Sequence, residues 1–218
     1  MKRLLSSVIL SSIFTLVVRS GLLIVVAASI SVSALAAAPI AKIQEMLEKP
    51  AVLCGRFDQT KQLMGIKKPL LSNGRFCVVN GKGVLWRTLQ PFPNTLRLKR
   101  DEIVQMQGDH VAMRLDAKQE PVVRMINSVM FSLVAGDLSQ LESLFDIDGS
   151  IQGNSWKVAL KARQPALAKA IGTLALTGGT TVKSVTINEA SGDRTEITFS
   201  GVQSGPNAMT AEEGAALD

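Results

Sequence analysis

Between residues 50 and 116 the chain consists of short runs in which apolar and polar side chains alternate. Alternation with a period of two gives each run one apolar face, so it predicts half-buried β-strands. Turn residues such as Asn80-Gly81 and Gly108-Asp109 separate the runs, with no helical pattern between them, which is typical of an antiparallel meander. The predicted strands are Val52–Leu63, Leu70–Val79, Gly83–Leu89, Thr95–Met106 and Val111–Leu115.

Helical patterns occur on both sides of this region. A short helix is predicted at Ala41–Leu47, and apolar residues recur at intervals of three and four from Pro121 to Val134, the stripe of an amphipathic helix. Pro121 suits the first helical turn because that position needs no N–H donor. After Gly136-Asp137, the leucines of Leu138–Phe145 predict a second helix.

The remainder of the chain returns to strand-like runs. These are Gly149–Ala162, Val182–Ile187 and Thr195–Phe199, with Pro165–Leu176 as a short helix or loop excursion. The small, polar stretch 201–218 is expected to lack regular structure. A sheet without helices on both faces must curl or pair to bury its apolar side. We therefore expect a mainly β fold with some helix, an unclosed antiparallel β-barrel wrapped around its helices.

The N-terminus has the features of an export signal. Lys2 and Arg3 precede two apolar runs, and the second run ends at Ala34-Leu35-Ala36. A basic start, an apolar stretch and an A-x-A end predict a secretory signal peptide over residues 1–36. The mature protein is then a single domain, residues 37–218, in the periplasm.

Arg19 interrupts the apolar stretch, because a charge at the centre of a bilayer span is costly. One hypothesis is that translation starts near Arg19, so that residues 1–17 are an over-extended start. The alternative is an uncleaved membrane anchor.

The charge balance argues against nucleic acid as a partner. The full chain has 24 basic and 18 acidic residues, and removal of residues 1–36 leaves 21 basic residues, a net charge of +3. Nucleic-acid binders are usually more basic, with the charge gathered on one face. We expect a soluble monomer.

The two cysteines of the chain, Cys54 and Cys77, lie in neighbouring predicted strands. If they face each other across a hairpin, the register places Gly65-Ile66 at its tip, and glycine there suits a type II′ turn. Directly opposed residues have the spacing that a disulfide needs, and the periplasm permits one. A disulfide and a pair of buried thiols both remain open.

The first three strands carry a family resemblance. The segments are Gly55-Arg56-Phe57-Asp58-Gln59-Thr60-Lys61, Pro69-Leu70-Leu71-Ser72-Asn73-Gly74-Arg75-Phe76, and Gly83-Val84-Leu85-Trp86 followed by Pro91. In order and spacing they resemble the periplasmic outer-membrane lipoprotein carriers of the LolA type. The resemblance covers about 50 residues, and its specificity comes from the ordered set rather than from any single segment.

The resemblance implies a half-barrel whose apolar interior holds the acyl chains of a lipoprotein or another lipid. Such a carrier would receive its cargo from an inner-membrane exporter and pass it to an outer-membrane acceptor, without a cofactor or a bound metal. The expected lining residues are Phe57, Met64, Leu70, Phe76, Leu85, Trp86, Val129 and Met130. The methionines supply flexible apolar surface, and strand alternation requires that some of these residues face away.

One position departs from the family pattern. LolA-type carriers often have Arg-Pro shortly before the tryptophan, and that arginine helps to latch a helical lid. This chain has Asn80-Gly81 there, with Lys82 as the nearest cation, so the latch and the usual lipoprotein cargo are both in question.

Catalytic patterns are weak. His110 is the single histidine, lies beside a predicted turn and has no Cys or His at metal-ligand spacing, so we interpret it as a surface residue. A Ser-His-Asp triad would depend on it. We therefore expect that the protein is not an enzyme. The alternative is a sensory or scaffold module that has the same fold, a filled core and a partner protein.

Overall fold

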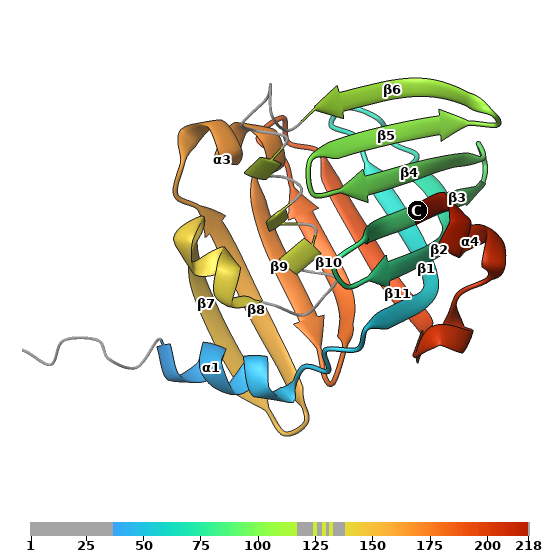
Figure 1. Ribbon diagram of the computed structural model, residues 1–218. Helices are drawn as coiled ribbons and strands as arrows, with labels where there is room; N and C mark the ends of the chain where they lie inside the picture. Colours follow the sequence, from blue (N-terminus) through green and yellow to red (C-terminus); the bar gives the residue numbers. More distant parts are fainter. Residues whose placement is uncertain (1–36, 117–123, 126–127, 130, 133–137, 218) are drawn as a thin grey trace, which may run out of the picture. The chain divides into compact units, whose positions relative to one another are not determined.

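The computed structural model describes residues 37–116 and 138–217, together with 124–125, 128–129 and 131–132 (Figure 1). The predicted signal peptide and Met130 lie outside the described residues. So does most of the predicted helix from Pro121 to Val134, although its six described residues are helical. Within the described residues, no helix is long and apolar enough to cross a membrane.

The strands form one 11-stranded antiparallel sheet in the order β6-β5-β4-β3-β2-β1-β11-β10-β9-β8-β7. Each half is a meander, and pairing of the first strand with the last joins the halves. Because β6 and β7 end the order without pairing to each other, the sheet is unclosed, which confirms the predicted fold class. The strands are β1 Val52–Gln62, β2 Leu70–Val79, β3 Gly83–Gln90, β4 Asn94–Lys99, β5 Glu102–Gln107, β6 His110–Asp116, β7 Phe145–Gln152, β8 Ser155–Ala162, β9 Thr173–Gly178, β10 Val182–Asn188 and β11 Arg194–Ser204.

Two predicted strands are in fact hairpins. The run Thr95–Met106 divides into β4 and β5 at a turn around Arg100, and Gly149–Ala162 divides into β7 and β8 at Gly153, which has a φ of 59°. Both turns are short, so the alternation continues across them and hides the break. The predicted Pro165–Leu176 excursion is the helix α3, Pro165–Ile171, followed by β9.

Helix boundaries also differ from the prediction. The first helix, α1, spans Ala37–Met46. The leucines after residue 137 form the 3-10 helix η1, Leu138–Ser143, and Phe145 already begins β7. The C-terminal tail is regular where we predicted irregularity: β11 runs to Ser204, and η2 (Pro206–Ala208) and α4 (Ala211–Leu217) follow.

The β1–β2 hairpin has the register deduced from its cysteines. Cys54 lies opposite Cys77, and Gly65 at the tip has a φ of 82°, a conformation that favours glycine. The pairing stops at Lys61 and Leu70, however. The tip is therefore a loop over residues 63–69 and not a two-residue type II′ turn.

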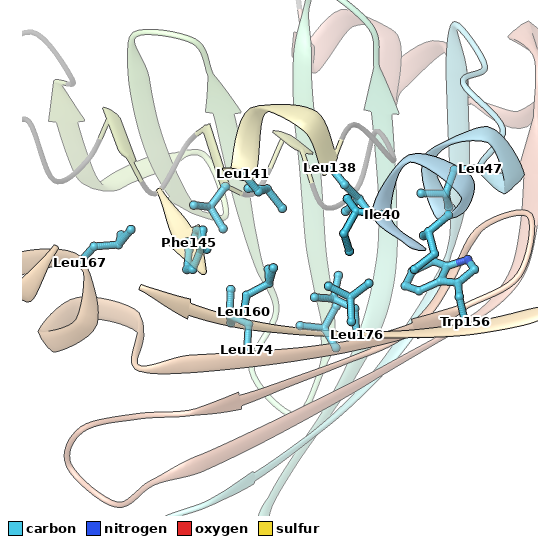
Figure 2. Packing of buried hydrophobic residues seen from close by; sticks show 14 residues of the cluster. Ile40, Leu47, Leu138, Leu141, Phe145, Trp156, Leu160, Leu167, Leu174 and Leu176 are labelled. Atoms are coloured by element: carbon cyan, nitrogen blue, oxygen red, sulfur yellow. The ribbon is translucent and has the colours of Figure 1, made fainter. Parts of the chain in front are cut away.

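The sheet has two faces that the register distinguishes. We call the side that carries Phe57, Phe76, Trp86 and Phe199 the aromatic face, and the side that carries Cys54 and Cys77 the disulfide face. Helices α1, η1 and α3 cover the aromatic face over strands β7–β10, where they bury leucines from both layers (Figure 2).

Two contacts show how this covered half is built. Gly149 of β7 leaves room for α1, since a Cβ there would lie 2.6 Å from the Cδ1 of Ile40. Trp156 of β8 is buried, and its indole N–H donates to the Gly179 carbonyl over 2.7 Å. The buried donor is thereby satisfied, and Trp156 joins the buried leucines of this half in one hydrophobic core.

Candidate functional site

A cluster of aromatic rings lies on the aromatic face of β1, β2, β3 and β11. The rings of Phe57 and Trp86 are stacked with centroids 3.9 Å apart, and Phe76 meets Phe199 edge to face at 5.0 Å. These are the favoured geometries of aromatic pairs. The four rings come from strands that are neighbours in the sheet, so the β1–β11 closure brings Phe199 to residues more than a hundred positions earlier.

Two glycines make room for these rings. Gly55 lies opposite Phe76, and Gly74 lies opposite Phe57. A Cβ at either glycine would lie 2.8 Å from the ring of its partner. Each ring therefore folds over the glycine across the strand pair, a device that lets a strand keep glycine without losing packing. The repeated Gly-Arg-aromatic spacing in β1 and β2 is the local sequence cause of the cluster.

The surroundings of the aromatic cluster are apolar but incompletely buried. Buried residues of this group come from β2–β5, and partly buried residues surround them; Phe131, from the helical segment between β6 and η1, packs against it. The partly buried members are Leu53, Trp86, Leu96, Leu115, Phe131, Phe199 and Val202. Seven of the twelve apolar residues of this group are only partly buried, against ten of twenty-four in the helix-covered core, so among the described residues the half of the aromatic face over β1–β6 is the less completely buried.

The described residues enclose one small cavity on this face. Among the described residues, a cavity lined by Leu53, Phe76, Val182 and Phe199, with two neighbours, measures about 20 Å³. That is room for about one water molecule. A larger hollow of about 550 Å³ lies on the disulfide face, where Arg56, Asp58 and Asn73 border it.

The predicted lining residues do not all lie together. Phe57, Phe76 and Trp86 lie together in the aromatic cluster, and Val129 is buried in the helix-covered core. Met130 lies outside the described residues. Sequence reasoning missed Phe199, Leu96 and Val202; for the first of these, the alternation of Thr195–Phe199 was the available signal.

Three predicted lining residues lie outside the aromatic cluster. Met64 and Leu70 are exposed at the tip of the β1–β2 hairpin, which extends beyond β3, because Asn73 is already opposite the last residue of that strand. Leu85 is buried on the disulfide face, opposite Cys77. Alternation along β3 places Leu85 and Trp86 on opposite sides of the sheet.

The C-terminal tail covers the disulfide face. Cys54 and Cys77 form a disulfide with an S–S distance of 2.15 Å, and both are 1 % exposed. Ala208 and Leu217 of the tail pack against this disulfide and against Leu85. The tail is therefore part of the folded domain.

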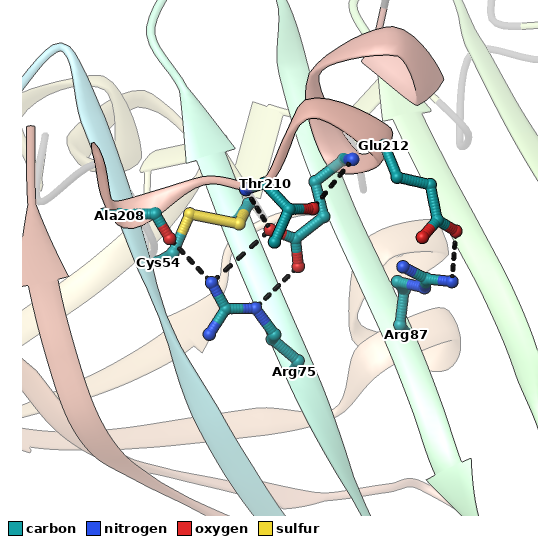
Figure 3. Close-up of polar contacts among 8 residues, drawn as sticks. Cys54, Arg75, Arg87, Ala208, Thr210 and Glu212 are labelled. Atoms are coloured by element: carbon teal, nitrogen blue, oxygen red, sulfur yellow. Dashed lines mark hydrogen bonds and ion pairs between the residues drawn. A yellow bond between two sulfur atoms is a disulfide. The ribbon is translucent and has the colours of Figure 1, made fainter. Parts of the chain in front are cut away.

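An ion pair fixes the tail over the disulfide (Figure 3). The Arg75 Nε donates to Glu213 over 2.6 Å, and an Nη of Arg75 donates to the Ala208 carbonyl over 2.6 Å. Thr210 and Glu213 form a reciprocal capping box, in which the Thr210 N–H donates to the carboxylate and the Glu213 N–H donates to the Thr210 hydroxyl. A second pair, Arg87 with Glu212, lies at the surface.

The charge on Glu213 depends on these donors. Burial disfavours the carboxylate, but hydrogen bonds from Arg75 and Thr210 and the nearby positive charge outweigh it and lower the pKa of Glu213. A lowered folded-state pKa stabilises the fold fully above the ordinary value of 4.5. The stabilisation is lost as the pH falls through the lower, folded value.

We expect this loss to be visible as a pH-dependent difference between the wild type and Glu213→Gln. The difference in urea midpoint is constant above about pH 5 and shrinks in more acidic solution, because the wild type then carries a neutral side chain as well. Urea titrations of both proteins over the acidic range measure it. A difference that stays constant down to pH 3 or grows as the pH falls contradicts the assignment.

Metal chemistry finds little support in the described residues. Cys54, Cys77 and Glu213 are the one group of three close potential ligands there, and its two sulfurs are bonded to each other. A cysteine binds a metal as its thiolate, so this group does not offer a soft metal site in its oxidised form. His110 is exposed at the start of β6. Asn80 and Gly81 form the tight β2–β3 turn, where the Asn80 N–H donates to the Ala51 carbonyl.

The family profile described as the outer membrane lipoprotein carrier protein LolA matches residues 48–211. The chain belongs to this family. The match extends the resemblance read from the first three strands across β11 and into the tail. No curated protein matches the sequence closely enough to add to this assignment.

The solved structures that match the chain have low identity to it. A LolA superfamily protein from Nitrosomonas europaea is 8 % identical, with 79 % of this chain and 95 % of that chain covered and a TM-score of 0.41. A DUF1329 family protein from Desulfovibrio piger is 10 % identical, with 82 % of this chain and 96 % of that chain covered and a TM-score of 0.44. A chain of the MucA/MucB complex of Pseudomonas aeruginosa is 14 % identical, with 79 % of this chain and 62 % of that chain covered and a TM-score of 0.44. This chain therefore spans less than two thirds of that neighbour.

Proposed function

We propose that the protein is a periplasmic, non-enzymatic carrier that shelters acyl chains of lipoproteins or other lipids for transfer toward the outer membrane. One observation carries the proposal: large apolar side chains around Phe57, Phe76 and Trp86 are only partly buried on the aromatic face over β1–β6. Membership of the carrier family supports it. An inner-membrane exporter and an outer-membrane acceptor are the partners that this role requires.

The physical need for such a face follows from the cargo. Each methylene group of an acyl chain costs about 0.8 kcal/mol when it is exposed to water, so a chain crossing the periplasm must be covered. Binding must also be reversible, and an apolar face provides non-directional contacts. The cavity that the described residues enclose measures about 20 Å³, so an acyl chain that binds there must displace side chains that pack on the aromatic face, such as Phe131.

Tryptophan fluorescence can test whether an acyl chain reaches the aromatic cluster. The chain has two tryptophans, and Trp86 lies in the cluster while Trp156 is buried in the helix-covered core. We expect a brominated fatty acid to quench Trp86 strongly, because bromine quenches at contact range. The Trp156→Phe variant isolates the emission of Trp86, and titration of that variant with the brominated acid measures the effect.

The matched control is Trp86→Phe, which leaves Trp156 as the emitter. Its fluorescence should change little at the same acid concentration. Emission from Trp86 that is unaffected at saturating acid, while the protein stays folded by circular dichroism, would count against the carrier. Equal quenching of both tryptophans would indicate non-specific adsorption.

The second candidate is a scaffold module that binds a partner protein. The filled core beneath α1, η1 and α3 and the small cavity favour it. This alternative predicts no quenching of Trp86 by the brominated acid and a periplasmic preparation without co-purifying lipid. Native mass spectrometry of protein purified from the periplasm distinguishes the two, because a carrier retains acylated species.

A further inference from the structure

Two loops expose large apolar side chains at one end of the sheet. Asn73 of β2 pairs with Gln90 of β3, so the β1–β2 loop and the β3–β4 loop leave the sheet at the same end. Beyond that pair, Leu71 stands on β2 and Phe92 stands in the β3–β4 loop. Of the eight exposed large apolar residues among the described ones, six lie here, with 51–77 % of their surface exposed. We name them the tip patch: Met64, Ile66, Leu70, Leu71, Leu89 and Phe92.

The hairpin that presents most of the patch is held by its neighbours. The Met64 N–H donates to Asp193 over 2.9 Å, and the Lys61 ammonium contacts Glu189 over 2.8 Å. The side-chain amide of Gln62 donates to the Ile66 carbonyl across the loop. The tip is thus fixed to the β10–β11 turn, and the apolar side chains are displayed from a defined conformation.

Positive charge is interleaved with the patch. Lys67 and Lys68 stand between Ile66 and Leu70, both are exposed, and neither has an ion-pair partner among the described residues. Two acids of the neighbouring β10–β11 turn, Glu189 and Asp193, already contact Lys61 and the Met64 N–H. The tip therefore presents uncompensated positive charge together with apolar surface.

We propose that the tip patch docks the protein onto the surface of an anionic lipid bilayer. Scattered exposed apolar residues are ordinary on a protein surface, but a group at one end that includes lysines has the chemistry of a membrane-surface anchor. Each lysine gains from an anionic surface, and the apolar side chains enter the headgroup boundary. The proposal rests on the carrier function, since docking would bring the aromatic face near the membrane that supplies or accepts the acyl chain.

Vesicle co-sedimentation tests the proposal with the full chain purified after export. We expect binding to vesicles of phosphatidylethanolamine with phosphatidylglycerol and little binding to phosphatidylcholine vesicles. Lys67→Gln with Lys68→Gln should weaken the binding tenfold or more, as the loss of two charges near an anionic surface implies. Leu71→Ser with Phe92→Ser should weaken it at least as much, and high salt should weaken the binding of the wild type.

Matched variants keep the comparison specific. Lys157→Gln with Lys161→Gln removes two exposed lysines from β8, and Met113→Ser removes an exposed apolar residue from the middle of β6. Both should bind vesicles as the wild type does. Because every variant has the same N-terminus, differences among them report the tip patch alone, and thermal melts establish that each is folded.

The outcomes separate this proposal from the carrier function. Tip variants that bind as well as the matched variants, or equal binding to phosphatidylcholine, overturn the docking site. In another outcome, the protein binds native membranes but not lipid vesicles, and protease treatment of those membranes abolishes the binding. That result assigns the tip patch to a protein partner and also overturns the bilayer docking site. The brominated-acid titration in solution should be unchanged by the tip variants. If that titration fails in the wild type while vesicle binding persists, the carrier function fails and the docking site stands.

Discussion

Replacing Cys54 and Cys77 together with alanine is expected to lower the free energy of unfolding by about 3 kcal/mol, because the disulfide joins residues 23 positions apart and restricts the unfolded chain. The bridge also links β1 to β2 directly beneath the C-terminal tail, so its loss removes buried contacts to Ala208 and Leu217. Equilibrium denaturation in urea, with and without reductant, measures the effect.

The control for this prediction is the response to reductant. The wild type, unfolded and refolded in reductant, should lose most of the same stability, whereas the double alanine variant should not respond. The native state should resist reductant, since both sulfurs are covered. A wild type whose unfolding curve is identical in oxidising and fully reducing conditions is incompatible with a stabilising bridge.

The local parts of the fold were predictable because their causes are local. Alternation gave the faces of β1–β3, and the cysteine spacing gave the hairpin register with Gly65 at the tip. The turns at Arg100 and Gly153 were missed because a tight turn leaves the period of two almost unbroken. The leucines after residue 137 form the 3-10 helix η1, and the chain then enters β7 at Phe145, because burial of Phe145 against the sheet stabilises the strand.

The aromatic cluster was predictable only where strands that are neighbours in the sheet also follow each other in the sequence. Phe57, Phe76 and Trp86 could be grouped from three consecutive strands, whereas Phe199 joins them through the pairing of the first strand with the last. Leu70 has the right alternation but lies beyond the end of β3 and is left exposed. Hydropathy identifies the apolar side of a strand, and the lengths of its neighbours decide how much of that side is covered.

The tail shows the limit of composition as a guide. Residues 201–218 are small and polar, yet Glu213 is among the buried residues, 138 positions from its partner Arg75. A buried carboxylate is stable only with such a partner. The partner lies on the face of β2 opposite Phe76, so the same strand supports the aromatic cluster on one side and the tail on the other.

Replacing Arg75 with alanine is expected to release the C-terminal tail. Glu213 is 2 % exposed, and without Arg75 its carboxylate would be buried with Thr210 as its remaining donor. Loss of one partner of a buried ion pair costs about 3 kcal/mol at the lower end of the usual range, which suits this pair because Arg75 is 34 % exposed. Undocking of α4 limits the cost, so the amides of the segment from Pro206 to Leu217 should exchange more than a hundredfold faster while those of β1 and β2 remain protected.

The order of three variants makes this prediction specific to the buried pair. Arg87→Ala breaks the contact with Glu212, which is 75 % exposed, and should cost less than 1 kcal/mol. In Glu213→Gln, the partly exposed guanidinium of Arg75 can be hydrated. The loss of stability in this variant should therefore fall between the losses in Arg75→Ala and Arg87→Ala. Hydrogen exchange followed by mass spectrometry resolves the tail in all three. Equal exchange in Arg75→Ala and Arg87→Ala would mean that apolar contacts with the disulfide, and not the ion pair, hold the tail in place.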